Sequence, residues 1–305
     1  MDEDAWLTER FTEHRTRLRA VAYRMLGSVS EADDAVQEAW LRLSRADTGS
    51  VENVAGWLTT VVARVCLNML RTRGSRREDP LDVHMPDPII SREDGGDPEQ
   101  EALLADSVGL ALLVVLDTLT PAERLAFVLH DMFAVPFEEL APMIERSPAA
   151  ARQLASRARR RVQGAAPAPD PDLRHQREVV DAFLAAARDG DFDALVAVLD
   201  PDVVLRADGG MARARYTVVL NGARTVAEQA VTAGRLAPFA RPALVNGTAG
   251  VVAVAGGQVL SVMGFTVTHS KIVAIDVLYD PDRLADLDLA VLDDSQAANG
   301  AAEST

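Results

Sequence analysis

The sequence has only one cysteine and one lysine, and 5% of its residues are aromatic. A single cysteine, Cys66, excludes an intrachain disulfide and any metal site built from clustered cysteines. Because Lys271 is the only lysine, arginine carries almost all of the positive charge. Cys66 is adjacent to an apolar helical stripe, so we expect an inert core thiol rather than a redox sensor.

Long apolar segments are also missing. No run approaches the length needed to cross a bilayer, and the N-terminus, MDEDAWLTERF, is acidic and polar, unlike a signal peptide. We therefore expect a cytoplasmic protein with no membrane segment. The 305 residues, 48% of them hydrophobic, are enough for two or three packed domains.

The formal net charge of −15 is distributed unevenly. Residues 1–76 carry 11 acids and 11 bases, and residues 107–164 carry 6 acids and 7 bases. The excess of acids lies in residues 77–106, with 10 acids and 2 bases, and in residues 165–305, with 19 and 11. Global acidity argues against non-specific binding to nucleic acid, but the two near-neutral segments can still carry local basic faces.

The first part of the chain, residues 5–73, has the apolar spacing of helices throughout. Ser30 with Asp33 predicts a capping box ahead of one amphipathic helix, and a second helix is expected from about Val54 to Arg73. Residues 74–100 contain four prolines, a Gly-Gly pair and many acids, which is typical of a linker.

A second helical module is expected over roughly 101–163. Thr120-Pro121-Ala122-Glu123 combines an N-cap, a first-turn proline and a capping-box glutamate. A short helix from Phe137 to Ile144 is followed by a turn and by an arginine-rich helix with Ser147 as its N-cap. This order is that of a helix-turn-helix, whose second helix enters the major groove of DNA.

The predicted secondary structure changes after a proline-rich linker, GAAPAPDPD. An amphipathic helix from Leu173 and a helix near 191–199 come first. Strand-like segments follow at 203–207, 215–220, 243–246, 250–255, 258–268 and 271–279. Helices followed by strands predict an α+β domain, and the tail after about 286 is expected to be disordered.

Three segments resemble known families. "SEADDAVQEAWLRL" with "GWLTTVVARVCLNMLRTRGSRR", within residues 10–75, is similar to the second conserved region of an extracytoplasmic-function sigma factor. Residues 112–162, from "LLVVLDTLTPAERLAFVLHD" to "SPAAARQLASRARRRV", resemble that family's fourth region. "REVVDAFLAAARDGDFDALVAVLDPDVVLRADGG" resembles the start of a SnoaL-like domain of the cone-shaped NTF2-like fold.

The resemblance implies a multidomain fold class: two all-α sigma modules, the second with a helix-turn-helix, followed by an α+β NTF2-like cone domain. The expected boundaries are 1–76 for region 2, 77–106 for an acidic linker, 107–164 for region 4, 165–172 for a proline-rich linker, 173–286 for the SnoaL-like domain and 287–305 for a disordered tail. The implied function is promoter-specific transcription initiation with core RNA polymerase.

The same resemblance assigns candidate sites in the sigma modules. The expected contact with core polymerase is an exposed face with Asp33, Asp34, Gln37 and Glu38. The minus-ten helix is expected to use Arg64, Asn68, Arg71 and Arg73, and Asn53, in the loop 46–53, is a candidate for capturing a flipped base. In the helix that reads the minus-thirty-five element, Arg152, Gln153 and Ser156 are placed for base edges, and Arg157, Arg159 and Arg160 for phosphates.

Three positions in the DNA-binding parts depart from the family pattern. Pro142 lies inside the first helix of the helix-turn-helix, where it removes a backbone donor and bends the helix. Glu145 stands where many relatives have a turn glycine. Val65 stands where many relatives have asparagine, so the family's downstream promoter preference is not transferred.

Sigma factors of the sigma-J type use the C-terminal extension in place of a separate anti-sigma partner. Their linker carries a Trp-Leu-Pro-Glu-Pro motif, partly matched here by His84-Met85-Pro86-Asp87-Pro88. The regulatory residues expected from the resemblance are a DGG motif, Asp208, Gly209 and Gly210, and a late motif, Asp280, Pro281, Asp282, Arg283 and Leu284. The domain is also a candidate for binding a small ligand of unknown identity; no cofactor, metal site or catalytic residue is expected.

Two alternatives stay open at this point. A DNA-binding regulator that never joins core polymerase would explain the helix-turn-helix, although it has no need for the module at 10–75. An enzyme of the SnoaL class fused to a DNA-binding module would use Asp208, His269 and Asp276 as acid–base groups. Asp276 shares its strand face with apolar residues, which predicts a raised pKa.

Overall fold

The computed structural model describes residues 3–45, 53–76, 84–92, 109–165, 168–210, 213 and 217–287. Contacts divide the chain into two compact units. The first contains residues 1–80, 101–106 and 113–166, and the second contains residues 81–100, 107–112 and 167–305. The parts expected to be regions 2 and 4 therefore belong to one unit, and a stretch of the expected acidic linker belongs to the C-terminal one.

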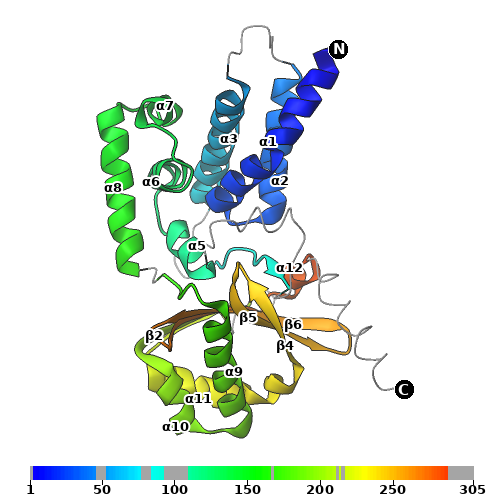
Figure 1. Ribbon diagram of the computed structural model, residues 1–305, viewed down its shortest axis with the longest axis vertical. Coiled ribbons are helices and arrows are strands. Elements are labelled where there is room, and N and C mark those ends of the chain that lie inside the picture. The colour runs from blue at the N-terminus through cyan, green and yellow to red at the C-terminus, as the bar shows by residue number, and fades with distance from the viewer. Residues whose placement is uncertain are drawn as a thin grey trace. The chain divides into compact units, whose positions relative to one another are not determined.

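The first unit begins with three helices, α1 (Glu3–Leu26), α2 (Val29–Leu43) and α3 (Val54–Arg76), which pack against one another (Figure 1). The predicted apolar stripe of α2 is confirmed, since Ala35, Val36, Ala39 and Leu43 are buried. The predicted capping box is wrong by two residues. The N-cap is Ser28, whose Oγ accepts a hydrogen bond from the backbone N–H of Glu31 at 3.4 Å.

The second half of this unit is also helical. Its elements are α5 (Leu110–Asp117), α6 (Pro121–Phe127), the π-helical η2 (Val128–Met132), α7 (Phe137–Leu140), the 3-10 helix η3 (Ala141–Met143) and α8 (Pro148–Ala165). The unit boundary falls within α5. The capping box of Thr120 and Glu123 is confirmed, with both reciprocal hydrogen bonds present. The predicted helix from Phe137 to Ile144 is wrong in its length, because α7 stops at Leu140 and the chain tightens into η3, which contains Pro142.

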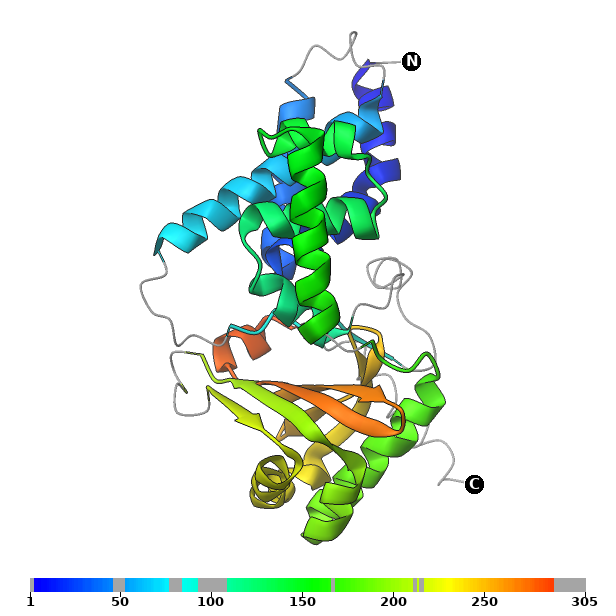
Figure 2. The ribbon, with the colours of Figure 1, turned by 90° about the vertical axis from the view of Figure 1, so that its left-hand side faces the viewer.

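The second unit is a mixed sheet covered on one face by helices (Figures 1 and 2). Its strands are β1 (Ile90–Ser91), β2 (Leu199–Asp208), β3 (Val218–Asn221), β4 (Ala240–Val245), β5 (Thr248–Ala255), β6 (Gln258–Thr268) and β7 (Lys271–Leu278), in the order β1-β4-β5-β6-β7-β2-β3. Only the β2–β7 pair is parallel among the described pairs. This is the α+β architecture that the sequence predicts.

The helices of this unit are α9 (Leu173–Asp189), α10 (Phe192–Val198), α11 (Ala223–Ala233), the 3-10 helix η5 (Gly234–Phe239) and α12 (Pro281–Ala285). Helices α9, α10 and α11 pack over the sheet around buried Val180, Phe183, Leu195, Val226 and Phe265. The prediction from sequence missed α11, although Ala223, Val226, Ala227 and Ala230 have helical spacing. No helix in the described residues is long and apolar enough to cross a membrane.

Candidate functional site

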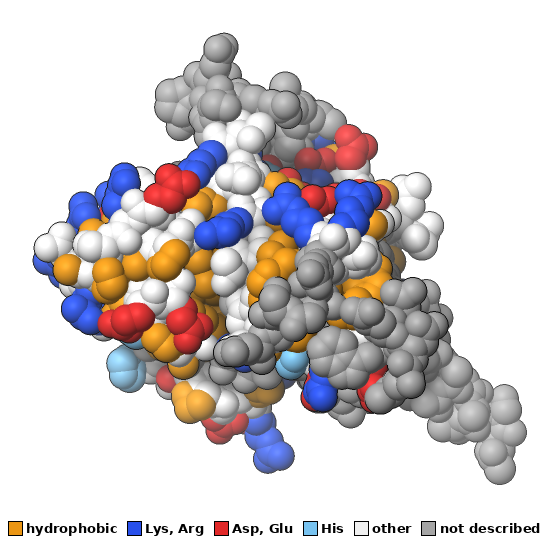
Figure 3. Space-filling model, turned by 90° about the horizontal axis from the view of Figure 1, so that it is seen from above, with side chains coloured by type: hydrophobic (Ala, Val, Ile, Leu, Met, Phe, Trp, Pro, Cys, Tyr) orange, Lys and Arg blue, Asp and Glu red, His pale blue; other side chains and the backbone are white. Residues whose placement is uncertain are grey.

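The arginine-rich helix α8 has a buried face and a solvent face. Its N-cap is Ser147, whose Oγ accepts from the backbone N–H of Ala150 at 3.2 Å. Small residues on one side, Ala151, Ala155 and Ala158, are buried where α8 packs on α6. The exposed residues on the other side are Arg152, Gln153, Ser156, Arg157 and Arg160. Seen from above, basic side chains gather along the left edge of the molecule, the side on which Figure 1 places α8 (Figure 3).

Some of these arginines already have partners. The Arg152 guanidinium lies 5.1 Å from the centroid of the Phe137 ring, and Phe137 stacks on His130. Arg159 Nε donates to Asp131 Oδ1 at 2.7 Å, so its charge is paired within the protein. Arg157 and Arg160 remain directed to solvent, apart from a 3.4 Å contact of Arg160 Nε with the Ser156 carbonyl. Arg157 and Arg160 are therefore better placed for phosphates than Arg159.

The turn before α8 carries backbone strain. Glu145 has φ of 55°, the left-handed region that favours glycine. This is the position where the family pattern has a turn glycine. The residue keeps the tight turn of the helix-turn-helix, at an energetic cost that a glycine would avoid.

Helix α3 presents Arg64, Asn68 and Arg71 to solvent. Arg73 instead donates from Nη1 to the Leu26 carbonyl at 3.1 Å and is ion-paired through Nη2 with Glu31, so it fastens α3 to α1 and α2. Asn53 is exposed and accepts the backbone N–H of Gly56 at 2.9 Å, which makes it the N-cap of α3. The rest of the predicted base-capture loop, residues 46–52, lies outside the described residues.

The acidic face of α2 is partly neutralised by neighbours. Asp34 and Gln37 are exposed. Asp33 accepts two hydrogen bonds from Arg19, at 2.6 and 3.0 Å, and Glu38 accepts one from Arg42 at 2.8 Å. Within the part of the chain that the structure describes, Asp33 and Glu38 have arginine partners, and none is found for Asp34 or Gln37.

The two helical halves of the first unit pack directly on one another, with α6 against α3 and η2 against α1. Arg124 of α6 is 1% exposed, pairs with Asp117 at 2.9 Å and donates from Nε to the Arg24 carbonyl at 3.1 Å. Arg24 lies 5.2 Å from the Phe133 ring centroid. Among the described atoms, Arg124 Nη2 is buried with no hydrogen-bond partner. The lost hydration of this group raises the free energy of the packed state.

Cys66 of α3 is buried beside the same contact. Burial raises the pKa of its thiol to about 12, and the nearby Arg124 only partly opposes the shift. Burial likewise lowers the pKa of Arg124, against the effect of Asp117. The predicted core location of Cys66 is confirmed, and a thiol with so high a pKa is a poor nucleophile, which agrees with the expected lack of reactivity.

In the second unit, the two predicted regulatory motifs meet a segment of the linker. Arg283 Nη1 pairs with Asp208 Oδ2 at 2.9 Å, and its Nε donates to Asp87 Oδ1 at 2.9 Å. The backbone N–H of Met85 donates to Asp208 Oδ2 at 2.9 Å, and the Met85 side chain is fully buried. We call residues 84–92 the docked segment and the Asp208–Arg283–Asp87 cluster the latch.

The glycines of the DGG motif allow this approach. Gly210 has φ of 60°, and a Cβ there would stand 2.1 Å from Asp280 Oδ2. A Cβ on Gly209 would stand 2.2 Å from the Arg213 carbonyl oxygen. Asp280 caps α12, which presents Arg283 to the latch and buries Leu284. The two motifs, about 70 residues apart in sequence, are therefore parts of one site.

The docked segment is held at its far end by the sheet. Strand β1 pairs with β4 and so forms one edge of the sheet. The Ile89 N–H donates to Asn246 Oδ1 at 3.1 Å, and the Asn246 N–H donates to the Ile89 carbonyl at 2.8 Å. Asn246 is buried and has φ of 51° in the turn between β4 and β5. The Asn-Gly pair at 246–247 is a hairpin-turn signal, but nothing in the sequence shows that its side chain binds a distant strand.

The three acid–base candidates do not form a catalytic group. Asp276 accepts hydrogen bonds from Arg206 at 2.7 and 3.3 Å, and burial raises its pKa, as predicted, against the opposing charge of Arg206. Asp208 belongs to the latch, and His269 lies in the turn between β6 and β7, at the opposite end of β7 from Asp208. Within the described ranges, no group of three or more His, Cys, Asp or Glu side chains is placed to hold a metal ion.

Comparison with known proteins identifies the family. The model of sigma-70 region 2 matches residues 10–76, and that of sigma-70 region 4 matches residues 109–162. The chain is 40% identical over 287 residues, 90% of its length and 91% of the relative's, to the "ECF RNA polymerase sigma factor SigJ" of Mycobacterium tuberculosis. The chain belongs to the ECF RNA polymerase sigma factors.

Two further likenesses cover almost the whole of this sigma factor. It is 36% identical over 280 residues to the "Probable ECF RNA polymerase sigma factor SigI" of M. tuberculosis, covering 89% of this chain and 92% of the relative. The crystal structure of M. tuberculosis SigJ superposes with a TM-score of 0.75 at 35% identity, covering 92% of this chain and 99% of that one. The similarity therefore includes the sheet domain as well as both sigma regions.

Several residues of this sigma factor have structural roles that the sequence does not predict. Arg124 fills the contact between the two helical halves, and Asn246 holds the docked segment. Arg73, Arg159 and Asn53 are expected to contact DNA, and in this structure each also makes an intramolecular contact; their role on promoter DNA stays a prediction.

Proposed function

We propose that this chain binds core RNA polymerase, directs promoter-specific initiation, and is controlled in cis by its sheet domain. The observation that carries the first part is the 40% identity to an ECF sigma factor over 90% of the chain, through both sigma regions. The exposed α8 face, with Arg152, Gln153 and Ser156 near its N-terminal end, supports readout of base edges.

Simultaneous reading of both promoter elements requires the two helical halves to separate. The two elements are about 25 base pairs apart by their names, which is roughly 85 Å of B-form DNA. A compact unit of about 140 residues is only ~40 Å across. The packing of α6 on α3 is thus a closed state that must open on the promoter. The unsatisfied Arg124 Nη2 in that contact favours opening.

The latch supports control of that opening through chain length. With His84 held, the chain from Arg76 to His84 reaches at most about 28 Å. With the docked segment released, the chain from Arg76 to Gly109 reaches up to about 115 Å. The latch therefore limits how far region 2 can move from the sheet domain. Release of the docked segment extends that distance about fourfold.

A catalytic role for the sheet domain has less support. The described residues that line its cavity include no Asp, Glu, His, Lys or Cys, and Tyr279 is the one side chain among them of a type that commonly acts as a general acid or base. We propose that the domain is a control domain without a reaction of its own.

Transcription in vitro with purified core enzyme tests the sigma function, scored on promoters upstream of the protein's own operon. We expect promoter-dependent initiation, with core binding weakened about tenfold by Asp34→Lys. Glu9→Lys, the same charge change at an exposed position of α1, is the control and leaves binding unchanged. Core binding without promoter-dependent initiation would contradict the proposal, and DNA binding without core binding would favour the conventional regulator.

Truncation tests the control in cis. A chain ending before Asp280 loses α12 and the latch arginine, and we expect its promoter output to change substantially, with an increase as the expected direction. A chain ending after Leu287 retains both and serves as the control. The two are compared at matched folded concentration. Equal output from both truncated proteins and the full chain would show that the latch does not control initiation.

A further inference from the structure

The sheet domain contains a cavity of about 1100 Å³. It lies between the sheet and the helices α9, α11 and η5, and its walls are mainly aliphatic and aromatic. Representative lining residues are Phe183, Leu205, Leu236, Met263 and Ile275. This volume and this apolar lining suit a small molecule the size of a lipid or a fused-ring compound.

The charged side chains of the lining are of one sign. The described lining residues include two arginines, Arg213 and Arg235, and no acid. The positive charge of the lining is opposite in sign to the net charge of residues 165–305, which carry 19 acids and 11 bases. An apolar cavity with only positive side chains at its wall favours an anionic ligand and disfavours a cation.

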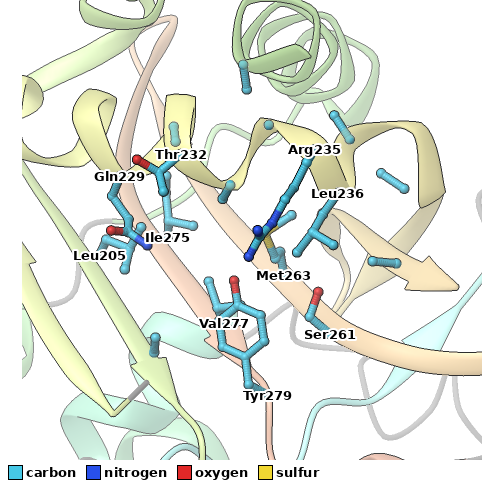
Figure 4. Close-up of a pocket in the computed structure, with 18 of the residues that line it drawn as sticks. Leu205, Gln229, Thr232, Arg235, Leu236, Ser261, Met263, Ile275, Val277 and Tyr279 are labelled. Atoms are coloured by element: carbon cyan, nitrogen blue, oxygen red, sulfur yellow. The ribbon is translucent and has the colours of Figure 1, made fainter. Parts of the chain in front are cut away.

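Arg235 is directed toward the centre of the cavity, and the hydroxyls of Tyr279 and Ser261 approach the same space from the sheet (Figure 4). No hydrogen bond or ion pair of the Arg235 side chain is found within the described part of the chain. Arg213 differs, because its Nη1 donates to the Tyr279 carbonyl at 3.3 Å. Arg235 is the lining arginine whose full set of donors is available to a ligand.

The backbone that carries Arg235 is firmly placed. Its neighbour Gly234 packs so closely on α9 that a Cβ there would stand 2.1 Å from the Ala187 carbonyl oxygen. Gly234 is buried, and α11 passes directly into η5 at this point. Close backbone packing on α9 fixes where the Arg235 side chain starts, which is the preorganisation that a specific polar anchor needs.

We propose that this cavity binds a small apolar carboxylate, with the carboxylate on Arg235 and the hydrocarbon body among the cavity's apolar side chains. A guanidinium presents two parallel N–H donors that match a carboxylate, and such charge-assisted pairs are stronger than neutral hydrogen bonds. Gln229, on the wall contributed by α11, adds a neutral polar group. The head group decides selectivity, since an alcohol or amine of equal length fills the same volume without pairing with the guanidinium.

Isothermal titration calorimetry on the full-length protein tests the proposal with three probes below their micellar concentrations: dodecanoate, dodecanol and dodecylamine. Dodecanoate is expected to bind saturably and at least about tenfold more tightly than dodecanol, and dodecylamine is expected to bind most weakly. Arg235→Gln should reduce dodecanoate affinity about tenfold and leave dodecanol unchanged. Arg188→Gln, at an exposed arginine of α9 outside the lining, should change neither.

Ala230→Trp fills the cavity from the α11 wall and should abolish binding of both dodecanoate and dodecanol, with circular dichroism verifying the fold. Persistent binding to this folded variant would place the ligand elsewhere and overturn the proposal. So would no saturable binding to the wild-type protein, equal affinities for dodecanoate and dodecanol, or equal losses in Arg235→Gln and Arg188→Gln. Binding is measured without polymerase or DNA, so its failure leaves the proposed sigma function untouched.

Discussion

Arg283→Met is the substitution that most directly tests the latch. The side chain keeps much of its apolar volume but loses the guanidinium that joins Asp208 and Asp87. The Arg283 side chain is 19% exposed and that of Asp208 is 7% exposed, so removal leaves carboxylates with little water to replace the charge. Breaking a largely buried pair from one side costs about 3–5 kcal/mol. Because the Asp87 side chain is 23% exposed and partly hydrated, we expect the lower end, about 3 kcal/mol.

A loss of that size should increase local opening of the docked segment roughly a hundredfold. The assay is amide hydrogen exchange at Met85 and Ile89, whose N–H groups bond to Asp208 and Asn246 in the docked state. Both amides should exchange faster by about the same factor, while amides of β6 stay protected. The second readout is promoter output, which should change in the same direction as truncation before Asp280.

Two controls separate the latch from general destabilisation. Arg174→Met makes the same chemical change at an exposed position of α9 and should leave exchange in the docked segment unaltered. Adding Asp87→Leu to Arg283→Met should restore part of the protection, because removing both partners costs less than stranding one. Unchanged exchange at Met85 and Ile89 in Arg283→Met would refute the reasoning outright.

Arg152→Ala should alter preference at one or two upstream base pairs by about 1–3 kcal/mol. Arg160→Ala should weaken binding to all sequences alike and lower the salt slope by about 0.9; equal, sequence-independent losses on promoter fragments would contradict this division. The free energy of unfolding should fall by about 1.4 kcal/mol per pH unit between pH 9 and 12, because the unfolded Cys66 thiol ionises near 9.0 and the folded one near 12. Cys66→Ala should remove that fall in urea titrations at pH 8 and 10.5, and an unchanged slope would refute it. Glu145→Gly should stabilise the helix-turn-helix by about 1 kcal/mol in thermal unfolding, and Glu145→Ala should not. A similar gain from alanine would mean that the strained turn is not the cause.

Local signals predict much of this molecule. Thr120 with Glu123 and Ser147 before Pro148 each act within one helical turn, so the sequence alone locates those two boundaries. Alternating valines predict the strands for the same reason. The cap predicted at Ser30 lies at Ser28 instead, because both serines precede an acid at capping-box spacing and this local pattern does not distinguish them.

The tertiary structure alone decides how distant groups combine. Arg283 and Asp87 are 196 residues apart, and no periodicity relates them. Nothing in the sequence predicts that Arg124 is buried, because its burial results from the packing of α6 on α3. The cavity exists because α11, absent from the sequence prediction, closes it over the sheet. Helix caps and helical or strand periodicity depend on residues close together in the sequence, so they can be predicted from it. An ion pair or a cavity depends on which surfaces meet after the chain has folded.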